Sequence, residues 1–200
     1  MSDAAMTRPI AVGAIDTRAV GWWAMWFLVF TEASLFAYLL FSYYYFASQA
    51  QTIGDFPPGG PPSITLAAPD TVILLLSSVA VSWGQFNIKH SHNRRLLFGL
   101  GLGAILGIIF LVVQYFEWSE KTFNISSHAY GSLYFTITGF HMAHVFVGVL
   151  ILIWLFIWSW RGYFNRVRYA HIHIGALYWH FVDVVWLFIF FTFYITPRLT

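Results

Sequence analysis

The sequence contains no cysteine and very few charged residues. The absence of cysteine from all 200 residues excludes disulfide bonds, iron–sulfur clusters and thiolate metal sites. Lysine, arginine, aspartate and glutamate together make up 9% of the chain, whereas a soluble domain carries about 25%. The ten Lys and Arg residues are dispersed through the polar connectors and form no basic patch, which excludes nucleic-acid binding. This scarcity of charge excludes a water-soluble globule.

Apolar and aromatic side chains dominate instead. They account for 59% and 21% of the residues, and the mean hydropathy is +0.69. Five apolar stretches are each long enough to cross the hydrocarbon core of a bilayer, which takes about 20 helical residues. They are residues 20–46, 71–90, 96–118, 130–160 and 174–195. We therefore expect an all-α integral membrane protein, with a five-helix transmembrane bundle in residues 20–200.

The positions of Lys and Arg predict how these spans are oriented. With the N-terminus inside, eight of the ten fall on the inner side and two, Lys121 and Arg198, on the outer side. The inner group is Arg8, Arg18, Lys89, Arg94, Arg95, Arg161, Arg166 and Arg168. Because basic residues accumulate on the cytoplasmic side of membrane proteins, we expect residues 1–19 to be a cytoplasmic segment and the C-terminus to lie outside. No small-residue cleavage site follows a compact apolar region, so we expect the first span to be retained.

Glycine recurs every fourth residue in the third span, at Gly99, Gly103 and Gly107. In a soluble protein this pattern would be weighed as a phosphate-binding loop. Here no strand precedes it and no lysine follows it, so it indicates close packing between membrane helices.

Ionisable side chains inside the bilayer are costly and are therefore the candidate functional residues. The span interiors contain Glu32 in the first span, His141 and His144 in the fourth, and His180 and Asp183 in the fifth. Glu32 has no cationic partner at its depth except a histidine, so its apolar surroundings favour the neutral acid. It is either a protonatable group beside a proton route or a neutral acid bonded across a helix interface.

The two polar pairs in the fourth and fifth spans each have the spacing i, i+3, so each pair shares a helix face. Asp183 can orient His180 through a ring nitrogen, and the same groups can form a plain interhelical network. His144 and His180 are the one credible pair for a bis-histidine haem, and all three histidines could take part in a copper or zinc site. The carboxylates and histidines are too few for a di-iron site, and we expect no metal in this chain.

Gln114 and Glu117 share a face near the outer end of the third span, where we expect Glu117 to be interfacial rather than buried.

The blocks around these polar positions resemble subunit III of heme-copper oxidases, and most of all cytochrome c oxidase subunit III. From the first span to the last they read MWFLVFTEASLF, LLLSSVAVSWGQFNIKHSHNRR, VVQYFEW, AYGSLYFTITGFHMAHVFVG and LYWHFVDVVWLFIFF. The resemblance implies an accessory, non-redox subunit of a proton-pumping terminal oxidase, which supports the stability and proton uptake of subunit I. It implies direct contact with subunit I, association with subunit II, bound phospholipid, and cytochrome c as a partner of the whole complex. Haem and copper are then held by the partner subunits, and this chain has no active site of its own.

The resemblance also assigns individual residues. Glu32 matches the family's intramembrane glutamate, which reacts with carbodiimides. His141 and His144 fall on the GFH-x-x-H positions, and His180 and Asp183 fall on the YWHFVD positions. Arg161 matches an arginine that binds a lipid headgroup.

Two departures from the family limit what can be transferred. Longer members have two additional N-terminal helices that form one arm of a lipid-filled cleft, and this sequence has no such segment. Seven residues before His180, longer members have a glutamate, whereas this chain has His173. The short five-helix form resembles bacterial members, so we expect the bacterial plasma membrane.

Three alternatives remain at this point. The chain could be subunit III of a quinol oxidase, or the five-helix accessory protein of nitric oxide reductase. It could also be an independent transporter or haem-binding membrane protein.

Overall fold

The computed structural model describes residues 20–49, 56–60, 62–88, 93–164 and 169–199. These parts of the chain are helical and contain no strand. Five helical segments are long and apolar enough to cross a membrane. They are α1 (Val20–Ser48), α3 (Ala67–Ile88), α4 (Asn93–Ser119), α5 (Ala129–Trp160) and the segment Ala170–Leu199. The last consists of α6 (Ala170–Phe190), the π-helical η2 (Phe191–Ile195) and α7 (Thr196–Leu199). The predicted all-α, five-helix membrane fold is confirmed.

Most helices extend beyond the apolar stretches that predicted them. α3 begins at Ala67 rather than at residue 71, and the fifth helical segment begins at Ala170 rather than at residue 174. The added turn of α3 carries Pro69 and Asp70, residue types that favour the first turn of a helix. Residues 1–19, which we predicted to be a cytoplasmic segment, lie outside the described residues.

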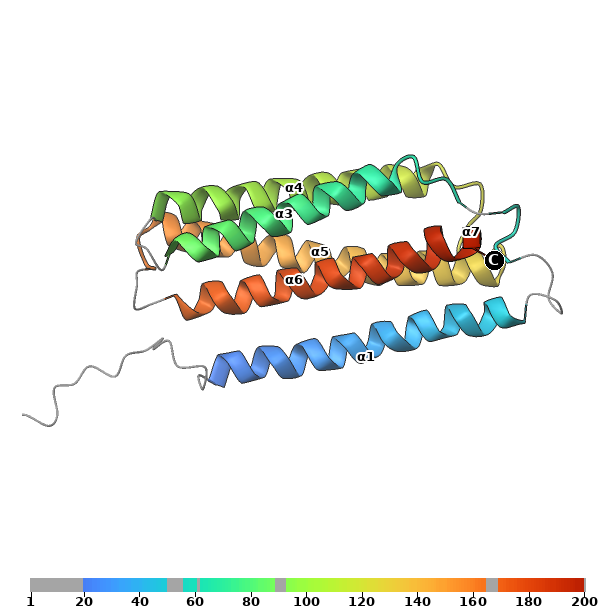
Figure 1. Cartoon of the computed structure of the whole chain (residues 1–200), viewed down its shortest axis with the longest axis horizontal. Coiled ribbons are helices and arrows are strands. Elements are labelled where there is room, and N and C mark those ends of the chain that lie inside the picture. The colour runs from blue at the N-terminus through green and yellow to red at the C-terminus, as the bar shows by residue number, and fades with distance from the viewer. Residues whose placement is uncertain (1–19, 50–55, 61, 89–92, 165–168, 200) are drawn as a thin grey trace, which may run out of the picture.

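Four of the helices form a closed ring, and α1 lies beside it (Figure 1). α3 packs on α4, α4 on α5, α5 on α6, and α6 returns to α3, whereas α1 packs against α5 and α6. Successive helices run in opposite directions, so the start of α1 and the end of α7 lie at opposite ends of the bundle. We call the end at which α1 begins the inner end and the opposite end the outer end.

The glycines of α4 allow α3 to approach closely. A Cβ atom at Gly99 would come within 2.6 Å of the Ala80 carbonyl oxygen and 2.8 Å of the Gly84 Cα atom. At Gly103 it would meet a Val81 methyl group at 2.5 Å. The predicted role of this glycine spacing in helix packing is confirmed.

Two buried tryptophans of α6 fill the centre of the ring. Trp179 takes the space that a side chain at Gly107 or Gly148 would occupy, and its indole Nε1 donates a hydrogen bond to Ser77 Oγ at 3.1 Å. Trp186 Nε1 donates to Thr71 Oγ1 at 2.9 Å. Both tryptophans thereby combine apolar packing with a satisfied polar atom, which fixes α6 against α3.

α1 is held mainly by aromatic contacts at its outer end. Tyr43 is 2% exposed, and its ring lies 4.9 Å from Phe193 and 5.2 Å from Phe56, centroid to centroid. The neighbouring Tyr44 hydroxyl lies 3.2 Å from Thr192 Oγ1. Much of the rest of α1 is exposed in this chain, including the large side chains Trp23, Phe27, Phe30, Tyr38 and Phe41.

The described cations separate between the two ends of the bundle. Arg94, Arg95 and Arg161 lie at the inner end, whereas Lys121 and Arg198 lie at the outer end. Five other members of the predicted inner group, Arg8, Arg18, Lys89, Arg166 and Arg168, lie outside the described residues. These five cations lie at the ends of the bundle to which the prediction assigned them, and the orientation of the chain in the membrane stays a prediction.

Candidate functional site

Glu32 and His144 form an ion-pairing contact between α1 and α5. Glu32 Oε2 lies 2.9 Å from His144 Nε2. The sequence predicts a histidine as the partner of Glu32, and His144 is that histidine. The other ring nitrogen, Nδ1, lies 2.6 Å from the Phe140 carbonyl oxygen. A carbonyl oxygen only accepts, so Nδ1 carries a proton and donates it there.

This tautomer places a proton between Glu32 and His144. If the imidazole is neutral, Nε2 has no hydrogen, and the Glu32 carboxyl group must donate. If the glutamate is ionised, Nε2 must carry the proton as part of an imidazolium. In both forms the pair has no net charge and contains one transferable proton. The Glu32 side chain is 31% exposed in this chain and that of His144 is 15% exposed, so the pair opens to the bundle surface.

His180 and Asp183 take part in a second polar group, between α6 and α3. His180 Nδ1 lies 2.6 Å from Ser78 Oγ, and Nε2 lies 3.1 Å from Ser82 Oγ. Asp183 Oδ2 is 3.8 Å from Nδ1, beyond hydrogen-bond distance. The two serines therefore orient the imidazole more directly than Asp183 does, and the group matches the interhelical network that the sequence allowed.

His141 stands apart from both groups. It is fully buried, its ring stacks on Trp186 at 4.9 Å, and the rings of Phe110 and Phe36 lie edge-on to it. Neither ring nitrogen has a hydrogen-bond partner within the described parts of the chain. In the same parts of the chain, no three His, Asp or Glu side chains are grouped as a metal site requires.

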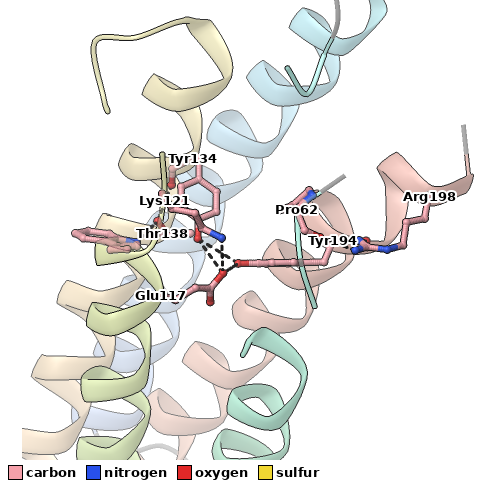
Figure 2. Close-up of polar contacts among 8 residues, drawn as sticks. Pro62, Glu117, Lys121, Tyr134, Thr138, Tyr194 and Arg198 are labelled. Carbon is pink, nitrogen blue, oxygen red and sulfur yellow. Dashed lines mark hydrogen bonds and ion pairs between the residues drawn. The ribbon is translucent and has the colours of Figure 1, made fainter. Parts of the chain in front are cut away.

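Glu117 is the centre of a buried network at the outer end (Figure 2). Its Oε1 accepts hydrogen bonds from Lys121 Nζ at 2.9 Å, from the Tyr134 hydroxyl at 3.2 Å and from the Tyr194 hydroxyl. The Lys121 ammonium also lies over the two tyrosine rings, 5.2 and 5.9 Å from their centroids. Three elements, α4, α5 and η2, thus converge on one carboxylate oxygen.

The expected interfacial position of Glu117 is wrong. Its side chain is 3% exposed, and Gln114, one turn deeper on the same face, is 0% exposed. The sequence gives only the depth of a residue along a span, whereas burial depends on which face of α4 turns toward its neighbours. Here that face turns toward α5 and η2, so protein rather than lipid headgroups surrounds the carboxylate.

Arg161 and an apolar cavity lie at the inner end. Arg161 is exposed and caps α5: its backbone N–H donates to the Ile157 carbonyl oxygen, and the next N–H, of Gly162, donates to the Ser159 carbonyl oxygen. The cavity has a volume of about 620 Å³ and lies between α1, α5 and α6. Its lining includes Met25, Leu150, Trp154, Trp158, Phe164 and Ile174. A wide apolar cavity with a cation at the same end of the bundle suits an acyl chain and its headgroup.

Comparison with known proteins places this arrangement in a family. The family model described as "Cytochrome c oxidase subunit III" matches residues 16–197. The chain belongs to the cytochrome c oxidase subunit III family. The match includes all five membrane helices and every candidate residue named above.

Individual relatives agree with the family model. Cytochrome c oxidase subunit 3 of Osphranter robustus is 34% identical over 174 residues, which cover 84% of this chain and 67% of that protein. The protein of the same name from Spodoptera frugiperda is 39% identical over 125 residues, covering 62% of this chain and 85% of its own length. That of Myxine glutinosa is 40% identical over 125 residues, which span about half (48%) of its own length.

Membership of this family makes the chain an integral membrane protein of the respiratory chain and part of a multisubunit oxidase. His173, at the position where we expect longer members to carry a glutamate, makes a short contact between its Nδ1 and the Gln85 side chain. An imidazole bonded to an amide differs from a carboxylate in charge, so no acidic role transfers to this position.

Sequence reasoning missed several residues that lie in or beside these groups, namely Ser78, Ser82, Asp70 and the two tyrosines bonded to Glu117, Tyr134 and Tyr194. Ser78 and Ser82 lie one turn apart on α3 and flank His180, but serines in an apolar helix give no pattern that separates them from packing residues. Asp70 is 0% exposed on α3, one residue before the predicted span. The sequence Ala-Ala-Pro-Asp, a start signal for a helix, could have placed it inside the helix.

Proposed function

We propose that this chain is the accessory, non-redox subunit III of a proton-pumping heme-copper oxidase, which passes electrons from cytochrome c to oxygen. Membership of the family supports the assignment to the complex. The names of the relatives reported above support cytochrome c rather than quinol as the donor. In this proposal the chain contacts subunit I, associates with subunit II, and lies in a bacterial plasma membrane with its N-terminus inside.

The Glu32–His144 contact is the observation that carries the proposed role in proton uptake. The pair holds one proton and stays neutral whether the proton is on oxygen or on nitrogen, so moving it between the two atoms changes no net charge inside the bilayer. Its partial exposure on the α1 side allows exchange with a neighbouring subunit or with water. The pair can therefore supply a proton to a route in subunit I.

The apolar cavity and Arg161 at the inner end support a role for a bound lipid. The cavity accepts an apolar chain, and Arg161 supplies a positive charge at the headgroup level. Such a lipid would fill the space beside α1 and help to hold subunit I and this chain together. His180 with its two serines, and Asp183 beside it, would form a separate polar network between α3 and α6 that carries no electrons.

The experiment compares Glu32→Gln with wild type in the purified complex. Glutamine keeps the shape of the side chain but cannot release an acid proton. We expect an unchanged haem absorbance spectrum and unchanged initial oxygen consumption. We expect fewer protons pumped per electron, and a half-life of turnover shortened about twofold or more because protons are replaced more slowly.

The control is Thr31→Val, which changes an exposed polar residue next to Glu32 whose hydroxyl donates to the Leu28 carbonyl oxygen of the same helix. Wild-type behaviour of Glu32→Gln in both turnover and pumping would contradict the role in proton uptake. Stoichiometric haem bound to the chain by itself would contradict the non-redox assignment.

A further inference from the structure

Buried polar atoms without partners gather at the outer end of the bundle. Asp70 and Gln114 are both 0% exposed, and neither side chain makes a hydrogen bond within the described parts of the chain. The second carboxylate oxygen of Glu117, Oε2, is also buried and unpartnered there. A buried polar atom without a hydrogen bond costs about 1–3 kcal/mol, so five such atoms in one region indicate a ligand that satisfies them.

Helix register places these three residues together. Gly84 of α3 lies against Gly99 of α4, and the two helices are antiparallel. Asp70 is fourteen residues before Gly84 and Gln114 is fifteen residues after Gly99, so the two lie at the same level. Glu117 is one turn further out on the face that carries Gln114, and its charge acts on the Asp70 carboxyl group.

The unpartnered atoms determine the chemistry of the ligand. Four are oxygens that accept hydrogen bonds, namely both oxygens of Asp70, Oε1 of Gln114 and Oε2 of Glu117, and one is the donating amide nitrogen of Gln114. A metal cation would satisfy the oxygens but repel the N–H group. Water both donates and accepts, and buried waters commonly bridge such groups.

The two carboxylates of this region, Asp70 and Glu117, require one more positive charge than Lys121 supplies. Lys121 neutralises Glu117 through Oε1, which leaves the Asp70 carboxylate without an ion-pair partner among the described residues. We propose that Asp70, Gln114 and Glu117 form an internal site that binds ordered water and one exchangeable proton, held mainly on Asp70. This site lies on the opposite side of the ring from α1 and does not depend on the role proposed for Glu32.

The groups around the site separate it from bulk solvent. α5 contributes Tyr134 and η2 contributes Tyr194, both bonded to Glu117, and Tyr130 of α5 and Arg198 of α7 lie within electrostatic range of one another. Trp186 of α6 closes the inner side through its bond to Thr71. Lys121 covers the outer side with its side chain 10% exposed. Exchange of the proton therefore requires movement of Lys121 or of a tyrosine.

Infrared spectroscopy of the purified complex tests for the proton. We expect a carbonyl stretching band of a protonated carboxylic acid that shifts in D₂O and is lost in Asp70→Asn. We also expect loss of this band in Glu117→Gln, because Lys121 then balances Asp70 and the proton is released. Glu120→Gln, which removes an exposed acid at the same end, is the matched control and should keep the band.

A cryo-electron microscopy map that resolves water tests for hydration. We expect water density within hydrogen-bond distance of Asp70 and Gln114, unchanged when sodium in the buffer is replaced by a large organic cation. An Asp70→Asn spectrum identical to wild type would overturn the proposed proton. A direct Asp70–Gln114 bond with no water, or a density that disappears without sodium, would overturn the hydrated site in favour of a dry contact or a bound metal cation.

Discussion

Tyr194 and Tyr130 are both buried at the outer end, and they differ in whether the hydroxyl group makes a hydrogen bond. The Tyr194 hydroxyl donates to the Glu117 carboxylate, whereas the Tyr130 hydroxyl has no hydrogen-bond partner among the described residues. Both rings are at most 2% exposed, and both pack on aromatic neighbours. The pair therefore separates the contribution of a hydrogen bond from that of ring burial.

We expect Tyr194→Phe to destabilise the chain by about 1.5 kcal/mol, because it removes one hydrogen bond to a buried carboxylate. Tyr130→Phe should leave the stability unchanged or raise it by about 1–3 kcal/mol, because it removes a buried hydroxyl that has no hydrogen bond to lose among the described residues. The measurement is the thermal midpoint for release of the chain from the purified complex. Equal midpoints for the two variants would show that the Tyr194 bond contributes nothing.

Searching the spans for ionisable side chains identified some residues of the site correctly, but it misjudged or missed others. It led to Glu32, whose pairing with a histidine follows from the lack of any other cation at that depth. It also led to Glu117 but predicted the wrong surroundings, because depth does not specify the helix face. Asp70 was missed because the apolar run begins one residue later, and hydropathy does not register a helix turn that precedes the run.

At the scale of the helix pair, α3 and α4 approach each other backbone to backbone at Gly99. Gly99 faces backbone atoms of Ala80 and Gly84, which cannot rotate away. Gly101, two residues along, would meet only the Phe156 ring, at 3.2 Å. The glycine spacing predicted that α4 packs closely against another membrane helix. It did not identify Gly84 of α3 as the contact, because the sequence of one helix does not say which helix lies beside it.

We expect Gly99→Ala to destabilise the chain by about 1–3 kcal/mol, because the added methyl group forces the two backbones apart. Gly101→Ala is the matched control and should be close to neutral, because a side-chain ring can shift by a few tenths of an ångström. Thermal midpoints of the purified complex compare the two. A Gly99→Ala variant as stable as Gly101→Ala would show that the close approach is not required.

At the scale of the whole molecule, alternating helix directions bring the starts of α1, α4 and α6 and the ends of α3 and α5 to one end of the bundle. This arrangement was predictable because each apolar run is long enough to cross the bilayer once. The side on which α1 packs was not predictable, because its apolar residues surround the whole helix and favour no face. The exposed aromatic side chains of α1 are consistent with a helix that contacts lipid or another subunit.

The absence of cysteine makes the predicted orientation directly measurable. We expect Ser126→Cys, in the outer connector, to react with a membrane-impermeant maleimide in intact cells. Tyr163→Cys, in the inner connector, should react only after the membrane is opened. The wild-type chain, separated on a gel, is the unlabelled control. Labelling of Tyr163→Cys in intact cells would reverse the orientation.

The π-helical turn Phe191–Ile195 has a consequence for insertions and deletions. A π turn accommodates one more residue than an α turn, and each α-helical residue rotates the chain by about 100°. Removing one residue from this segment would convert it to an ordinary α-helix and leave the residues after it facing nearly the same way, because the π turn already absorbs the extra residue. Removing one residue from α6 would instead rotate Tyr194 and Arg198 by about 100°, away from Glu117 and Pro62, so a deletion is tolerated at the π turn and disrupts the outer end of the bundle when it falls before it.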